Sequence, residues 1–197
     1  MTLPLLYFGS IYYYHLIATR NCSISSREKF PKQSMRNRCY LIGSNGEQRL
    51  IIPVNRRQGS QSMFDEIYLE NMHDWTRNHS QTIISAYGAA PFFEHYWSQL
   101  QTIFEKEEKT LKNFNERILR ITCKCLNLTM PLYSENKVEF EEKFKGPKSN
   151  LDWHTYIQVF RDKFPFSPDL SILDLIFNLG PEAGLYLNNP FKSMQIS

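Results

Sequence analysis

The chain has 197 residues, a length that suits one domain (residues 1–197) whose core needs no disulfide or metal ion for stability. Hydrophobic residues make up 42% of the sequence and aromatic residues 14%, which excludes a disordered chain. A formal net charge of +3 is too small to indicate nucleic-acid binding, so we expect no nucleic-acid partner.

The cysteines and the apolar segments bear on compartment and cofactors. Cys22, Cys39, Cys123 and Cys125 show neither CxxC nor zinc-ribbon spacing, and the sequence contains no GxGxxG, Walker, GxSxG or DxD motif. It shows no cleavable leader and no apolar run of the ~20 residues that a membrane helix needs. We therefore expect a cytoplasmic protein without a membrane span, a metal site or a cofactor.

The first thirty residues predict a strand–helix–strand unit. Residues 3–8 are wholly apolar, which is typical of a strand covered on both faces. Ser10 is placed to cap a helix over residues 11–20. A second strand is expected within residues 21–30, parallel to the first.

A β-hairpin follows. The β-forming runs 40–42 and 50–52 flank Ser44, Asn45 and Gly46, residue types that favour a tight hairpin turn.

The remainder of the chain is mainly helical. In α-helical spacing, Trp75, His79, Ile83 and Tyr87 share one face. The fold class is therefore α/β or α+β: a small mixed sheet with the strand–helix–strand unit and the hairpin, covered by a mainly helical C-terminal half. The predicted elements are a strand at 64–69, helices at 74–87, 91–104 and 111–126, a strand at 128–133, a charged loop at 135–149, a stretch at 153–163 with Trp153, Tyr156, Ile157 and Phe160 on one face, and a last helix capped by Ser171.

Three cationic and two amide side chains stand directly ahead of the hairpin and could bind an anion. They are Lys32, Gln33, Arg36, Asn37 and Arg38. Arginine side chains form paired hydrogen bonds with phosphate or carboxylate oxygens, and ligands often bind at the edge of an α/β sheet. The alternative is a salt-bridged turn in which the arginines pair with carboxylates such as Asp65 or Glu66.

Cys39 and His79 are the candidate catalytic residues. Arg36 and Arg38 would lower the pKa of the Cys39 thiol, and the resulting thiolate would need a base such as His79. The alternative is a small core cysteine and a hydrogen-bonded, partly buried histidine.

Three further polar residues occupy positions that bear on the site. His15, on the first helix, could line the site, and Tyr87 lies on the same helix face as His79. Asp174 stands three residues after Ser171, a spacing that favours a helix-capping role over that of a catalytic acid.

Three segments together resemble the WbqC-like protein family. They read PKQSMRNRC ahead of the hairpin, W-x3-H-x3-I-x2-AYG-x2-PFF, and F-x-P-x-L-S-I-L-D-L-I-F-N-x-G-P-E. The resemblance covers nearly the whole chain and implies a role near bacterial surface polysaccharides such as O-antigen. Where the family typically has a proline-rich turn, this chain has Phe8-Gly9-Ser10-Ile11, which puts ligand contact by that turn in doubt.

Two functions are compatible with these features. The first is a transferase acting on an acyl or aminoacyl group or an activated sugar in polysaccharide synthesis, with a nucleotide sugar or an acyl thioester as the anionic ligand. The second is a binding or scaffold protein of the same pathway that holds such a ligand without chemistry. Convergence of Cys39 and His79 on one cleft would favour the transferase.

Overall fold

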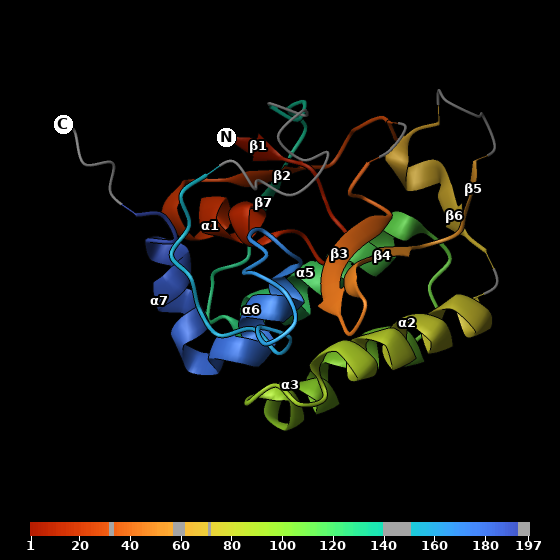
Figure 1. Cartoon of the computed structure of the whole chain (residues 1–197). Coiled ribbons are helices and arrows are strands. Elements are labelled where there is room, and N and C mark those ends of the chain that lie inside the picture. The colour runs from red at the N-terminus through yellow and green to blue at the C-terminus, as the bar shows by residue number, and fades with distance from the viewer. Residues whose placement is uncertain (32–33, 57–61, 71, 140–150, 193–197) are drawn as a thin grey trace.

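The computed structural model describes residues 1–31, 34–56, 62–70, 72–139 and 151–192, and it confirms a mixed α/β fold (Figure 1). The strands are β1 (Thr2–Leu3), β2 (Ser23–Ser25), β3 (Arg38–Gly43), β4 (Gly46–Ile51), β5 (Val54–Arg56), β6 (Ile67–Leu69) and β7 (Leu132–Ser134). The helices are α1 (Ile11–Thr19), α2 (Met72–Tyr87), α3 (Phe93–Leu100), α4 (Thr102–Glu105), α5 (Leu111–Cys125), α6 (Ile172–Leu179) and α7 (Ala183–Asn188), with 3-10 turns η2 (Phe64–Glu66) and η4 (Gly180–Glu182).

A parallel sheet of order β1-β2-β7 forms one end of the molecule (Figure 1). Ser10 caps α1 as predicted, and β1, α1 and β2 form the expected strand–helix–strand unit. The first strand is shorter than residues 3–8, however. Pro4 has no N–H for a ladder, and the Tyr7 N–H bonds to the Met35 carbonyl at 3.1 Å instead. The chain thus leaves the sheet early while remaining buried.

The β3–β4 hairpin is confirmed. Cys39 lies opposite Leu50, and Gly43 pairs with Gly46 across a two-residue loop. Gly46 has φ of +101°, a conformation that residues with a side chain rarely adopt.

Gly46→Val is expected to lower the free energy of unfolding by about 1–3 kcal/mol, because valine is strained at this φ. The nearest atoms to an added Cβ belong to Phe164 at 3.8 Å, so the loss would come from the backbone and not from a clash. Urea denaturation measures the loss. Ser44→Val is the control, because Ser44 is an exposed loop residue without positive φ. Equal stabilities of the two variants would contradict the prediction.

The helical half differs from the prediction in several places, and the strand expected at 128–133 begins only at Leu132. The helix expected at 91–104 is divided into α3 and α4, and residues 64–66 form η2 ahead of the short strand β6. The stretch 153–163 is irregular and ends in a turn. Trp153 is buried beside Phe191, whereas Ile157 is 63% exposed, so its apolar residues share no buried face. Most of the charged loop predicted at 135–149 lies outside the described residues.

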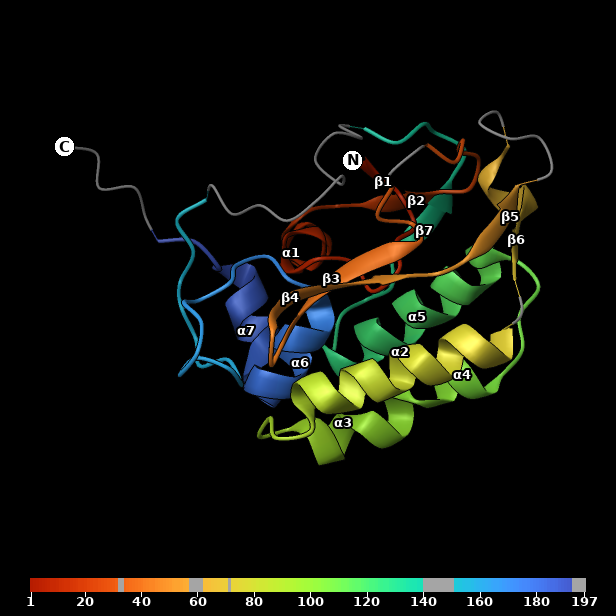
Figure 2. The same cartoon turned by 45° about the vertical axis from the view of Figure 1, so that its right-hand side comes forward.

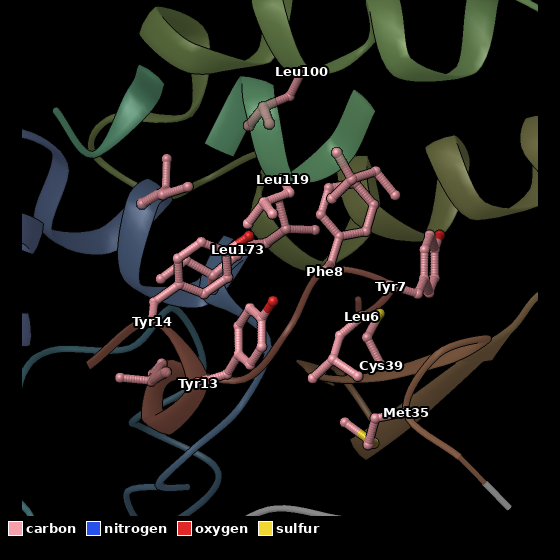
Figure 3. Packing of buried hydrophobic residues seen from close by; sticks show 14 of the residues in the cluster. Leu6, Tyr7, Phe8, Tyr13, Tyr14, Met35, Cys39, Leu100, Leu119 and Leu173 are labelled. Carbon is pink, nitrogen blue, oxygen red and sulfur yellow. The ribbon is translucent and has the colours of Figure 1, made fainter. Parts of the chain in front are cut away.

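The helices α2 and α5 lie beneath the hairpin and carry much of the core (Figure 2). Trp75, His79, Ile83 and Tyr87 are all buried, which confirms the predicted inward face of α2. The Trp75 ring meets the Phe114 ring of α5 edge-on, with 5.3 Å between the ring centres. The core extends through Tyr7 and Phe8 to α1 and α6 (Figure 3).

Candidate functional site

A cavity of about 490 Å³ lies beyond the carboxyl ends of the parallel strands. The segment after β2 and the segment after β7 both contribute to its wall. Ligands of parallel α/β sheets characteristically bind at this edge. Its described lining residues are Arg27, Glu28, Lys29, Pro31, Arg36, Met63, Lys137 and Val138.

Hydrogen bonds near the sheet hold these segments together. The Ser25 hydroxyl lies 3.2 Å from the Arg27 carbonyl oxygen and 2.9 Å from that of Asn136, which places the residues after β2 beside those after β7. Thr2 of β1 and Glu139 exchange two hydrogen bonds of 3.0 Å. All three parallel strands therefore help to position the cavity.

A second pair of hydrogen bonds positions the wall that contains Met63. The Phe30 N–H donates to the Ser62 carbonyl at 3.1 Å, and the Phe64 N–H donates to the Glu28 carbonyl at 2.8 Å. These bonds set Lys29 opposite Met63 in an antiparallel bridge. A cationic and an apolar side chain consequently line the same cavity.

A buried ion pair between Glu28 and Arg36 adjoins the cavity. Arg36 is 1% exposed, and its Nε and Nη2 both donate to Oε2 of Glu28, the former at 3.1 Å. Its Nη1 donates to Ser34 Oγ at 2.9 Å, and its guanidinium lies 5.9 Å from the centre of the Phe64 ring. The Leu5 N–H donates to the other Glu28 oxygen at 3.4 Å.

The cavity wall carries an excess of positive charge. Four cations and one carboxylate line it, a formal sum of +3, and Glu28 is paired with Arg36. The other three cations, Arg27, Lys29 and Lys137, are all exposed. Such a concentration of one sign attracts anions. Arg27 and Lys137 are 110 positions apart (137 minus 27), so no local pattern in the sequence could have revealed the group.

Among the described members of the predicted basic cluster, Arg36 alone lines this cavity. Lys32 and Gln33 lie outside the described residues. Arg36 is paired with Glu28, a different partner from the Asp65 or Glu66 of the salt-bridge alternative.

The two remaining members of the predicted cluster are absent from the described lining of the cavity. Asn37 donates to the Ile52 carbonyl at 3.1 Å, while its Oδ1 is buried without a hydrogen-bond partner among the described residues. Arg38 begins β3 opposite Ile51, and its Nε is likewise buried and unpaired in the described part of the chain.

The Cys39 thiol is buried in the core rather than activated. Cys39 has no exposed surface and belongs to the same cluster as Leu6, Tyr7 and Met35 (Figure 3). Burial raises the pKa of this thiol well above its ordinary value of 9.0, so the thiol is protonated at neutral pH. The expectation that neighbouring arginines lower its pKa is wrong, because desolvation dominates.

His79 is a buried histidine bonded to core groups. It is 5% exposed, and its Nδ1 lies 2.8 Å from the Tyr7 hydroxyl. The Ile51 backbone also contacts it, and burial lowers its pKa to about 4, so the ring is neutral at pH 7. Neither His79 nor Cys39 is among the described residues that line this cavity.

The other candidates lie in separate contacts. His15 Nδ1 is 2.7 Å from the Leu187 carbonyl oxygen and joins α1 to α7. The side chain that caps α6 is that of Ser171, whose Oγ accepts from the Leu173 N–H, and not that of Asp174. The buried Tyr87 instead adjoins Asp174.

Asp174 is the centre of a buried polar cluster. Its Oδ2 accepts hydrogen bonds from the Tyr156 hydroxyl and from Gln158 Nε2, the latter at 2.9 Å. Burial raises the pKa of Asp174 to about 6, and the hydrogen bonds partly oppose that rise. The spacing of Ser171 and Asp174 in the sequence favours a helix cap and gives no sign of this cluster.

Residues 6–144 match the WbqC-like protein family, and this range contains every described residue of the cavity. The chain belongs to the WbqC-like protein family. A similar chain is "Uncharacterized protein Rv1507c" of Mycobacterium tuberculosis, 26% identical over an alignment length of 195; the match covers 81% of this chain and 84% of that protein. No solved structure matches the chain. Within the described ranges, no helix is long and apolar enough to cross a bilayer.

Proposed function

We propose that this WbqC-like protein binds a small phosphate-bearing ligand in the cavity at the carboxyl ends of β1, β2 and β7. The observation that carries the proposal is the meeting of Arg27, Lys29 and Lys137 at that edge of the sheet. Guanidinium and ammonium groups form strong charge-assisted hydrogen bonds with phosphate oxygens. The cavity volume falls in the range that holds a small organic ligand.

The geometry supports ligand binding better than a covalent reaction with Cys39 as the nucleophile. The transferase hypothesis assigned the nucleophile to Cys39 and the base to His79, yet Cys39 is fully buried with a protonated thiol and His79 is bonded to Tyr7. The family resemblance points to surface-polysaccharide synthesis as the pathway. A nucleotide sugar and an acyl thioester of coenzyme A both carry the phosphates that such a site would hold.

The test is isothermal titration calorimetry with inorganic pyrophosphate. Wild-type protein is expected to bind it, and Arg27→Gln and Lys137→Gln are each expected to weaken binding about tenfold, the effect of losing one charge-assisted hydrogen bond. Lys124→Gln is the control, because it removes one exposed positive charge from α5, outside the described lining. Absence of binding, or equal weakening in all three variants, would contradict the proposal.

A further inference from the structure

Building on the proposed function, we infer that the phosphate of the ligand is attached to a flexible aliphatic chain rather than to a nucleoside or a sugar. Three features of the cavity carry this inference: the kind of apolar side chain in its wall, the state of its hydrogen-bond acceptors, and its size. Each constrains the part of the ligand beyond the phosphate.

The apolar part of the described wall is aliphatic. It consists of Pro31, Met63 and Val138. An unbranched methionine adapts to flexible apolar partners. Phe64 lies close by, but its ring is stacked on that of Phe30, with 6.1 Å between the ring centres. The Arg36 guanidinium lies over the same ring. The described lining therefore contains no aromatic face on which a nucleobase would stack.

Several acceptors near the cavity are already used. Glu28 is the carboxylate of the described lining, and its two oxygens accept from Arg36 and from the Leu5 N–H. The Glu28 carbonyl accepts from the Phe64 N–H, and the Arg27 carbonyl oxygen lies within bonding distance of the Ser25 hydroxyl. Sugar hydroxyls need acceptors as well as donors, whereas a phosphate needs donors only. The polar groups of the wall thus suit a phosphate better than a sugar.

The cavity is larger than a phosphate requires. Its volume of about 490 Å³ leaves room for a chain beside the charged group. Each methylene group that is fully buried against the aliphatic wall strengthens binding about fourfold. A prenyl phosphate carries its phosphate on a purely aliphatic chain, and the phosphopantetheine arm of an acyl carrier has it on a flexible chain that also contains amide groups.

The experiment compares three phosphate monoesters by calorimetry at one salt concentration: methyl phosphate, n-hexyl phosphate and uridine monophosphate. Hexyl phosphate is expected to bind at least about tenfold more tightly than methyl phosphate, and uridine monophosphate no more tightly than methyl phosphate. Geranyl phosphate and 4′-phosphopantetheine then identify the source of the chain, and tighter binding of either than of methyl phosphate supports the inference.

Variants separate the two parts of the site. Met63→Ser is expected to remove most of the preference for hexyl phosphate while leaving the affinity for methyl phosphate unchanged, and Lys137→Gln is expected to weaken both ligands alike. Val138→Ser repeats the first test at a partly exposed position, should Met63→Ser fail to fold.

Two outcomes would overturn the inference, and they differ from failure of the proposed function. If methyl and hexyl phosphate bind equally, or if uridine monophosphate binds most tightly, the chain is not aliphatic although the anion site stands. If neither these monoesters nor pyrophosphate binds, both the inference and the proposed function fail.

Discussion

Replacing Arg36 by methionine is expected to lower the free energy of unfolding by about 3–5 kcal/mol, the loss typical of breaking a buried ion pair. The variant would leave the Glu28 carboxylate buried without the cation that now donates to it twice. The long hydrogen bond from the Leu5 N–H, at 3.4 Å, does not replace that cation. Urea denaturation at pH 7 measures the change.

Arg38→Met is the matched control, two residues along the chain. Its Nε is buried without a partner among the described residues, so its loss is expected to leave stability nearly unchanged. The double variant Glu28→Leu with Arg36→Met should recover much of the loss, because apolar residues often replace a buried pair without cost. Similar losses for Arg36→Met and Arg38→Met would show that the ion pair is not what stabilises this region.

Between pH 6.5 and 4, His79 and Asp174 are expected to change stability in opposite directions. The pKa of His79 is about 4 in the folded protein against an ordinary 6.5, so the unfolded chain takes up the proton first and stability falls as the pH falls. The pKa of Asp174 is about 6 against an ordinary 3.8, so the folded protein takes up the proton first and stability rises. Each residue changes the free energy of unfolding by about 3 kcal/mol between its ordinary pKa and its pKa in the folded protein.

The two effects largely cancel in the wild-type chain and should appear when one residue is replaced. Relative to wild type, His79→Gln is expected to gain stability as the pH falls from 6.5 to 4. Asp174→Asn is expected to lose stability over nearly the same range. Urea denaturation at pH 4, 5, 6 and 7 measures both, and using differences from wild type removes the contribution of other carboxylates. Parallel curves for the two variants would contradict the prediction.

The sequence by itself determined the elements that depend on neighbouring residues. The glycine at the hairpin turn, the Ser10 and Ser171 caps and the inward face of α2 each rest on contacts or conformations within a few positions, and the structure confirms them. The same segments carried the family resemblance, which the match over residues 6–144 confirms.

The tertiary structure alone decided which side chains became available for function. The cationic neighbours of Arg36 in sequence favour an anion-binding role, but folding places Glu28 against its guanidinium and uses its charge. The arginines near Cys39 in sequence favour an activated thiol, but burial acts more strongly on the pKa of that thiol than those charges do. The cavity depends on β2 and β7, which lie far apart in sequence and pair in the folded chain, so its cations come together from distant positions. Local patterns encode backbone conformation, whereas burial, ion pairing and the meeting of distant charges depend on the packed chain as a whole.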